Sequence, residues 1–147
     1  MIHPAPTTKI DPRLARGTFL GAVAATATKP ASVKLAFPNT RYEMHLLPES
    51  GVATEPGKRI IGTIHAQARR IDRVETGGRY VEPVFGRPRR VQGRVVAVET
   101  ESNEVVVHAG VPIHCRPTDP RQKATDFAEG DFVSFDVLEG ATFRVES

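Results

Sequence analysis

The chain has very little of what several common architectures need. Its 147 residues include a single cysteine, Cys115, which excludes an intrachain disulfide framework and a cysteine-rich zinc site. No run of about 18 apolar residues occurs, so we expect neither a membrane-spanning helix nor a membrane partner. Tryptophan is absent and aromatic residues make up only 6% of the chain, which counts against ligands held mainly by aromatic stacking.

Glycine and proline, by contrast, are frequent, with twelve of each. This composition suits a fold of short strands and turns better than a bundle of long helices. The hydrophobic share of 39% and the charged share of 25% are those of an ordinary soluble domain. We therefore expect a single soluble domain, and the lone cysteine is consistent with the cytoplasmic location that we predict.

The first 31 residues show no sustained hydrophobic periodicity, and they contain four prolines. Basic residues precede the short apolar segment 19–24, as they do in a secretory leader. That segment is shorter and richer in alanine and glycine than the core of a leader usually is. We therefore interpret residues 1–31 as a flexible N-terminal arm and residues 32–147 as a single β-barrel domain.

Beyond the arm, apolar and polar residues alternate with the period of two that predicts strands. The first two alternating segments form a predicted hairpin at 33–47, and the later ones span 59–74, 79–85, 91–99, 104–108, 133–137 and 141–145. Asp119 followed by Pro120 predicts one short helix that ends near Phe127. Because no long helix separates the strands, the predicted fold class is all-β: a small antiparallel barrel with an added N-terminal hairpin and one short helix.

Three segments resemble a cold-shock domain, a member of the OB-fold group. They are Gly93–Val98, Glu104–His108 and Glu129–Val137, of which the last has the Glu-Gly-x-x-Val-x-Phe-x-Val tract of that family. The resemblance covers about a third of the chain, and it implies an OB-like barrel that binds single-stranded nucleic acid. Ala97 and Val106 stand where the family carries stacking aromatics. Binding of this kind would therefore depend on charge more than on stacking.

Basic charge is concentrated in the middle of the chain. Eight arginines accompany three acidic residues between positions 69 and 94, whereas the C-terminal third has ten acidic and four basic residues. If the strands that start near Arg59 and Arg90 share one sheet face, their polar rows would offer hydrogen-bond donors to phosphates. The predicted nucleic-acid-binding residues are His65, Gln67, Arg69, Arg79, Tyr80, Arg87, Arg89, Arg90, Gln92 and Arg94. Two alternatives stay open: the arginines are solvated or paired with the chain's own carboxylates, or they bind an acidic protein partner.

No group of residues predicts catalysis. His108, His114 and Cys115 suggest a zinc site, but their spacing matches no recognised ligand pattern, and the adjacent His114 and Cys115 would point to opposite faces of a strand. No serine lies in a Gly-x-Ser-x-Gly elbow, and no glycine-rich loop leads into a helix that could hold phosphate. We therefore predict no catalytic residue, no metal and no cofactor.

These patterns favour a binding module over an enzyme. The preferred prediction is charge-driven binding of single-stranded RNA or DNA through the arginine-rich strands. The alternative is a protein-interaction or assembly module without catalytic activity, whose docking surface would be an exposed apolar patch around Tyr42, Met44 and Leu46.

Overall fold

Twelve strands and one 3₁₀ turn form the part of the chain that the computed structural model describes, residues 11–49, 51–52, 54–75 and 77–146. The strands are β1 (Ala15–Val23), β2 (Ser32–Ala36), β3 (Glu43–Pro48), β4 (Arg59–Ala68), β5 (Asp72–Arg73), β6 (Tyr80–Glu82), β7 (Phe85–Gly86), β8 (Arg90–Glu99), β9 (Glu104–His108), β10 (Pro112–Pro117), β11 (Phe132–Asp136) and β12 (Thr142–Val145). None of the described residues belongs to a helix long and apolar enough to cross a membrane.

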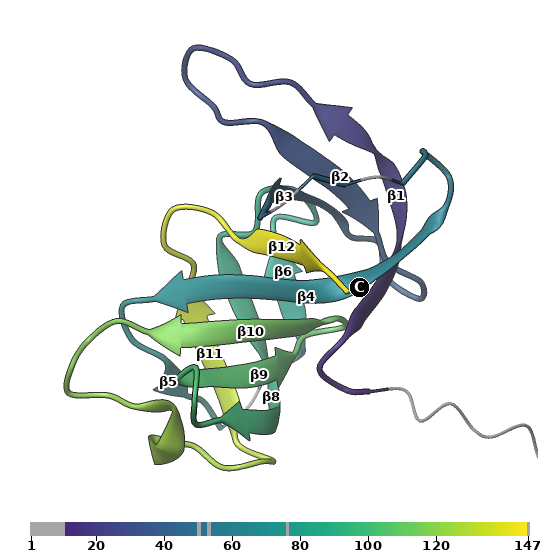
Figure 1. The fold of residues 1–147 in the computed structure, drawn as a ribbon. Helices are drawn as coiled ribbons and strands as arrows, with labels where there is room; N and C mark the ends of the chain where they lie inside the picture. The colour runs from purple at the N-terminus through teal and green to yellow at the C-terminus, as the bar shows by residue number, and fades with distance from the viewer. Residues whose placement is uncertain (1–10, 50, 53, 76, 147) are drawn as a thin grey trace, which may run out of the picture.

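Strand β4 belongs to two groups of strands (Figure 1). In the first group, β1, β2, β3, β12 and β4 close into a five-stranded ring, because β4 pairs with β12 and also with β1. In the second, β10, β9, β8, β11 and β5 continue the sheet from β4. The predicted all-β barrel is confirmed, but the sheet is mixed and not antiparallel as predicted, since β4 with β10, β3 with β12 and β3 with β7 are parallel pairs.

The alternation along β4 explains how the core is built. Ile60, Ile64, Ala66 and Ala68 are buried on the inner face of the strand, while the residues between them are more exposed. Gly62 falls in the same inner row, and a Cβ atom there would lie 2.2 Å from the carbonyl oxygen of Arg144 on β12. Glycine at this position therefore allows two backbones to approach more closely than a side chain permits.

The predicted flexible arm is wrong for the described residues from 11 onward. Strand β1 lies within the ring and pairs with β2 and with β4. Ala15 and Phe19 are buried, and Gly17 packs closely against Phe37. The inner row of β1 consists of alanine, glycine and one phenylalanine, which gives almost no hydrophobic periodicity, so the sequence pattern does not reveal the strand. Backbone pairing with both neighbouring strands holds it in place. Residues 1–10 of the predicted arm lie outside the described residues.

The predicted helix after Asp119 is also wrong, because only one 3₁₀ turn forms, at Ala124–Asp126. The Asp119 carboxylate accepts the backbone N–H of Arg121 at 2.9 Å, which closes a local turn. Lys123 then adopts an extended backbone with φ −126° and ψ 156°, so a helix cannot continue through this point.

The predicted hairpin at 33–47 forms from β2 and β3, but its apolar residues are not exposed. Met44 and Leu46 are 1% and 0% exposed, because the hairpin is part of the closed ring. The Tyr42 hydroxyl donates to the carbonyl oxygen of Ala109 at 2.9 Å and accepts the N–H of Val81 at 3.0 Å. The predicted apolar docking patch is therefore absent from the described surface, and Tyr42, directly before β3, links that strand to the segments after β9 and in β6 instead.

Candidate functional site

A cleft lies between the β1–β2 hairpin and the segment from β6 to the start of β8. The hairpin extends away from the rest of the fold in Figure 1, and its inner side faces this segment. The charged residues that line the cleft are Lys29, Arg87, Arg89 and Arg90, together with one carboxylate, Glu82. We call this region the basic cleft. Its volume is about 850 Å³.

An exposed aromatic ring lines the basic cleft. Phe85 on β7 is 66% exposed, and the ring of His45 meets it edge-on with 6.5 Å between ring centroids. Backbone pairing holds the segment in place, because Glu43 N–H donates to the Val84 carbonyl and β7 pairs with β3. The predicted strand 79–85 is interrupted at Pro83, which separates β6 from β7.

The arginines of the cleft differ in their partners. Arg90 forms an ion pair with Asp136 at 2.7 Å and donates to Ser134 at 3.3 Å. Arg87 makes only a long contact, 3.5 Å, to the Glu139 carbonyl oxygen. Of the eight arginines between 69 and 94, only Arg73 and Arg90 pair with a carboxylate among the described residues. Internal pairing with the acidic C-terminal third therefore accounts for a minority of these arginines.

The remaining predicted residues lie elsewhere. The polar rows of β4 and β8 do not form one continuous face, because β10 and β9 lie between the two strands. On β4 or directly after it are His65, Gln67 and Arg69. Arg79 directly precedes β6, and Tyr80 is the first residue of β6. Gln92 and Arg94 are on β8. Gln92 is buried and bonds to Tyr80 and to the Gly78 carbonyl, which gives it a structural contact. The fold thus groups Arg87, Arg89 and Arg90, and Arg90 Nε donates to the Tyr80 hydroxyl at 3.4 Å, whereas the other six residues do not line the basic cleft.

The predicted site residues did not include Lys29 or Phe85, although Phe85 and Tyr80 are the two aromatic rings near the arginines in the sequence. Phe85 carried a usable signal, since a phenylalanine beside a basic loop and two residues after a proline has little chance of a core position. Lys29 carried none, because it reaches the cleft only through β1, a strand that the sequence did not reveal.

The residues considered for zinc are not brought together. Cys115 points into the core with 0% exposure, and burial followed by the nearby Glu104 charge raises the pKa of its thiol. His108 lies beside Arg79, whose guanidinium donates to its Nδ1 atom at 3.1 Å. His114 points to the other face of β10 and meets a histidine and a glutamate that no sequence spacing connects with it.

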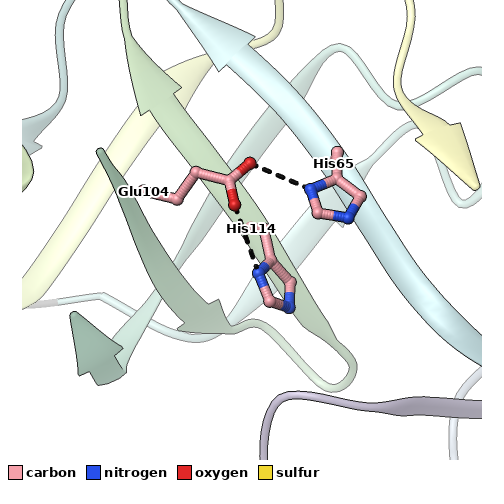
Figure 2. Close-up of side chains that lie close together, drawn as sticks. All are labelled: His65, Glu104 and His114. Carbon is pink, nitrogen blue, oxygen red and sulfur yellow. Dashed lines mark hydrogen bonds and ion pairs between the residues drawn. The ribbon is translucent and has the colours of Figure 1, made fainter. Parts of the chain in front are cut away.

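Figure 2 shows this second group, which we call the His–Glu–His cluster: His65 on β4, Glu104 on β9 and His114 on β10. The Nδ1 atom of His65 is 2.9 Å from Glu104 Oε2, and the Nδ1 atom of His114 is 3.6 Å from Glu104 Oε1. Burial alone would raise the pKa of the Glu104 carboxyl, but the contacts with the two imidazoles and with Ser102 outweigh it and hold that pKa far below its usual range. Glu104 is therefore a carboxylate at neutral pH.

No protein-family model, curated protein or solved structure matches the chain significantly. The three segments that resemble a cold-shock domain fall on β8, β9 and the neighbourhood of β11, and β8 pairs with both of the other strands. They are thus adjacent in the barrel. The assignment to that family gains nothing from the comparisons, so function has to be inferred from the side chains of this chain alone.

Proposed function

We propose that this protein is a binding module for single-stranded nucleic acid and that the basic cleft is its binding surface. The observation that supports this most directly is one exposed aromatic ring, Phe85, in a cleft lined by four cationic side chains and a single carboxylate. The cationic groups come from two separate parts of the chain, the β1–β2 hairpin and the segment from the β7–β8 loop to the first residue of β8. An extended strand that passes between these parts would meet positive charge on both sides.

The chemistry of the lining fits a phosphodiester chain with unpaired bases. Guanidinium groups donate two parallel hydrogen bonds to a phosphate, and neutralising each phosphate releases a bound counterion. An exposed phenylalanine offers a surface on which any base can stack, a contact worth about 1–3 kcal/mol per base. A duplex hides the faces of its bases, so this combination favours single strands.

A second candidate function has one specific observation in its favour. Val84 and Phe85 are adjacent and 46% and 66% exposed, so they form a small apolar surface next to the arginines. An acidic protein segment with an apolar residue would complement it. Such binding would select a peptide over an oligonucleotide and would not depend on base stacking.

The decisive experiment is a fluorescence-anisotropy titration of labelled single-stranded RNA and DNA of mixed sequence. If three phosphates are contacted, affinity should fall roughly 20-fold between about 50 and 200 mM salt. Phe85→Ala should weaken binding about tenfold. The double variant Arg87→Ala/Arg89→Ala should weaken it further and reduce the slope of the logarithmic salt dependence by about 1.4.

The control is Arg70→Ala, which removes one positive charge, half of that removed in the double variant, from an exposed residue outside the cleft. It should change affinity by less than about twofold, because long-range charge effects are screened at these salt concentrations. Equal losses in the Arg70 and Arg87/Arg89 variants would contradict a localised site. Absence of salt-dependent binding in the wild-type protein would contradict the proposal and favour the protein-binding candidate.

A further inference from the structure

The His–Glu–His cluster lies on the outer face of three neighbouring strands, in the order β4, β10, β9. His114 is the direct partner of His65 in the parallel pairing of β10 with β4, so the two side chains leave the sheet side by side. Their ring centroids are 4.8 Å apart. Glu104 reaches both rings from β9, and one ligand atom from each residue lies within 4.8 Å of the others. From this convergence we propose that His65, Glu104 and His114 bind one divalent transition-metal ion, of which Zn²⁺ is the reference.

The distances are close to those of such a site. Zinc binds imidazole nitrogen and carboxylate oxygen at about 2.0–2.2 Å, which separates neighbouring ligand atoms by roughly 3.0–3.5 Å. The two nitrogen–oxygen distances in the cluster, 2.9 and 3.6 Å, bracket this range. The two distances end on different oxygens of the carboxylate, and the ligand atoms as a set lie within 4.8 Å, so an ion would draw the three side chains closer together.

The hydrogen-bond partners of His114 also support a metal site. Its Nε2 atom lies 2.9 Å from the carbonyl oxygen of Arg13, which can only accept, so Nε2 carries a hydrogen. A neutral His114 then presents the bare lone pair of Nδ1 to the Glu104 carboxylate at 3.6 Å. Two lone pairs that face each other need a positive charge between them. A metal ion with both groups as ligands supplies it, as does a proton on Nδ1, and the test below distinguishes the two.

The outer nitrogens of both histidines are anchored as metal-bound imidazoles are. His65 Nε2 is 2.8 Å from the hydroxyl oxygen of Thr63, and His114 Nε2 is fixed by the Arg13 carbonyl. Ser102 also donates to Glu104 Oε1 at 3.0 Å. Contacts of this kind set the tautomer of each ligand and orient it toward the metal.

The identity of the ligands limits the ion. Two imidazole nitrogens and one carboxylate suit zinc and the neighbouring first-row metals, whereas calcium and magnesium prefer oxygen alone. Three protein ligands leave a coordination position open, and a cleft lined by Arg116, Thr142 and Arg144 adjoins His65 and Glu104. This cleft shares no lining residue with the basic cleft, so the metal site is independent of the proposed nucleic-acid surface.

The test is a competition titration of chelator-treated full-length protein with Zn²⁺ and a chromophoric indicator. The wild-type protein should bind one equivalent of Zn²⁺, and both Glu104→Gln and His65→Ala should weaken binding at least about tenfold. The control is His108→Ala, which removes a histidine from the other end of β9 and should leave the affinity within about twofold. Absence of one-equivalent binding, or equal affinity in the wild type and both cluster variants, would overturn the proposal.

Two further readouts separate a metal site from a protonated His–Glu pair. Zn²⁺ should raise the melting temperature of the wild type and leave that of Glu104→Gln unchanged. The ¹⁵N shift of His114 Nδ1 in the Zn²⁺-loaded protein should be that of a metal-bound nitrogen, and an imidazolium shift would overturn the proposal. If His65→Ala fails to fold, the nearly isosteric Glu104→Gln still decides the outcome.

Discussion

The basic cleft and the His–Glu–His cluster use charge in opposite ways. In the basic cleft, cationic side chains lie on loops and strand ends, and among the described residues only Arg90 has a carboxylate partner there. In the cluster, polar side chains lie on the faces of central strands, and each contacts another polar group at 2.8–3.6 Å. Three of the four cationic groups of the cleft thus have no carboxylate partner among the described residues, whereas the polar groups of the cluster partner one another.

The difference follows from where each region lies in the sheet. The cluster depends on the parallel pairing of β4 with β10, which fixes backbone positions through a continuous hydrogen-bond ladder. The basic cleft depends on the two-residue strand β7 and on a hairpin that extends from the ring. Small ligands need rigid donors, while a flexible polymer tolerates movement of the groups that bind it. Changes in the two regions should therefore have separable effects on stability and on binding.

The largest expected difference compares the same substitution in two phenylalanines. Phe143 on β12 is 1% exposed in the core, so Phe143→Ala should reduce the free energy of unfolding by about 3–5 kcal/mol. Phe85 is 66% exposed, so Phe85→Ala should change that free energy by less than about 0.5 kcal/mol while it weakens oligonucleotide binding. Urea denaturation followed by circular dichroism measures both values. A large loss of stability in Phe85→Ala would show that the exposed ring has a structural role.

A smaller effect is expected from two glycine-to-alanine changes. A Cβ atom at Gly62 would overlap the carbonyl oxygen of Arg144, so Gly62→Ala should cost about 1–3 kcal/mol of stability. Gly78 precedes β6 and has no heavy atom within 4 Å of its Cβ position, so Gly78→Ala should stay within about 0.5 kcal/mol of wild type. The same denaturation experiment compares them. Equal costs at the two positions would contradict the view that β4 is the more constrained element.

The sequence predicted the strands whose two faces differ strongly in hydrophobicity. The segments of β8 and β11 alternate, whereas β9 is a β-branched run with three buried valines. Each of these strands lies close to its predicted limits. Strand β1 was missed because alanine and glycine on its inner face bury little apolar area, although its backbone pairs on both edges. The helix was overpredicted because an aspartate before a proline starts a turn as readily as a helix.

The two candidate sites were predictable to different degrees for a physical reason. Arg87, Arg89 and Arg90 are neighbours in the sequence, so any fold that exposes this loop concentrates their charge. His65 and His114 become neighbours only through the parallel pairing of β4 with β10, and local alternation specifies neither the partner nor the register of a strand. For the same reason, Glu104 looked like an ordinary polar residue at the start of a strand.

The smallest expected effect concerns His108, at the end of β9 that faces the arginines. Burial, and then the charge of Arg79, lowers the pKa of His108 below the usual value near 6.5. The native protein therefore keeps this imidazole neutral at pH values where the unfolded chain already binds a proton. Its contribution to stability is complete above about pH 6.5 and is lost as the pH falls from there toward the lowered pKa.

To measure this effect, the unfolding free energy of wild type and of His108→Gln is determined at pH 7.5 and at about pH 5.5. The difference between the two proteins is then compared at the two pH values, because the contributions of the other titrating groups cancel in it. Wild type should lose more stability than His108→Gln on acidification, and Arg79→Gln should fall between them, because it removes the neighbouring charge but not the burial. Parallel losses in all three proteins would contradict it. Neither burial nor the charge of Arg79 would then disfavour the protonated form of His108 in the native protein.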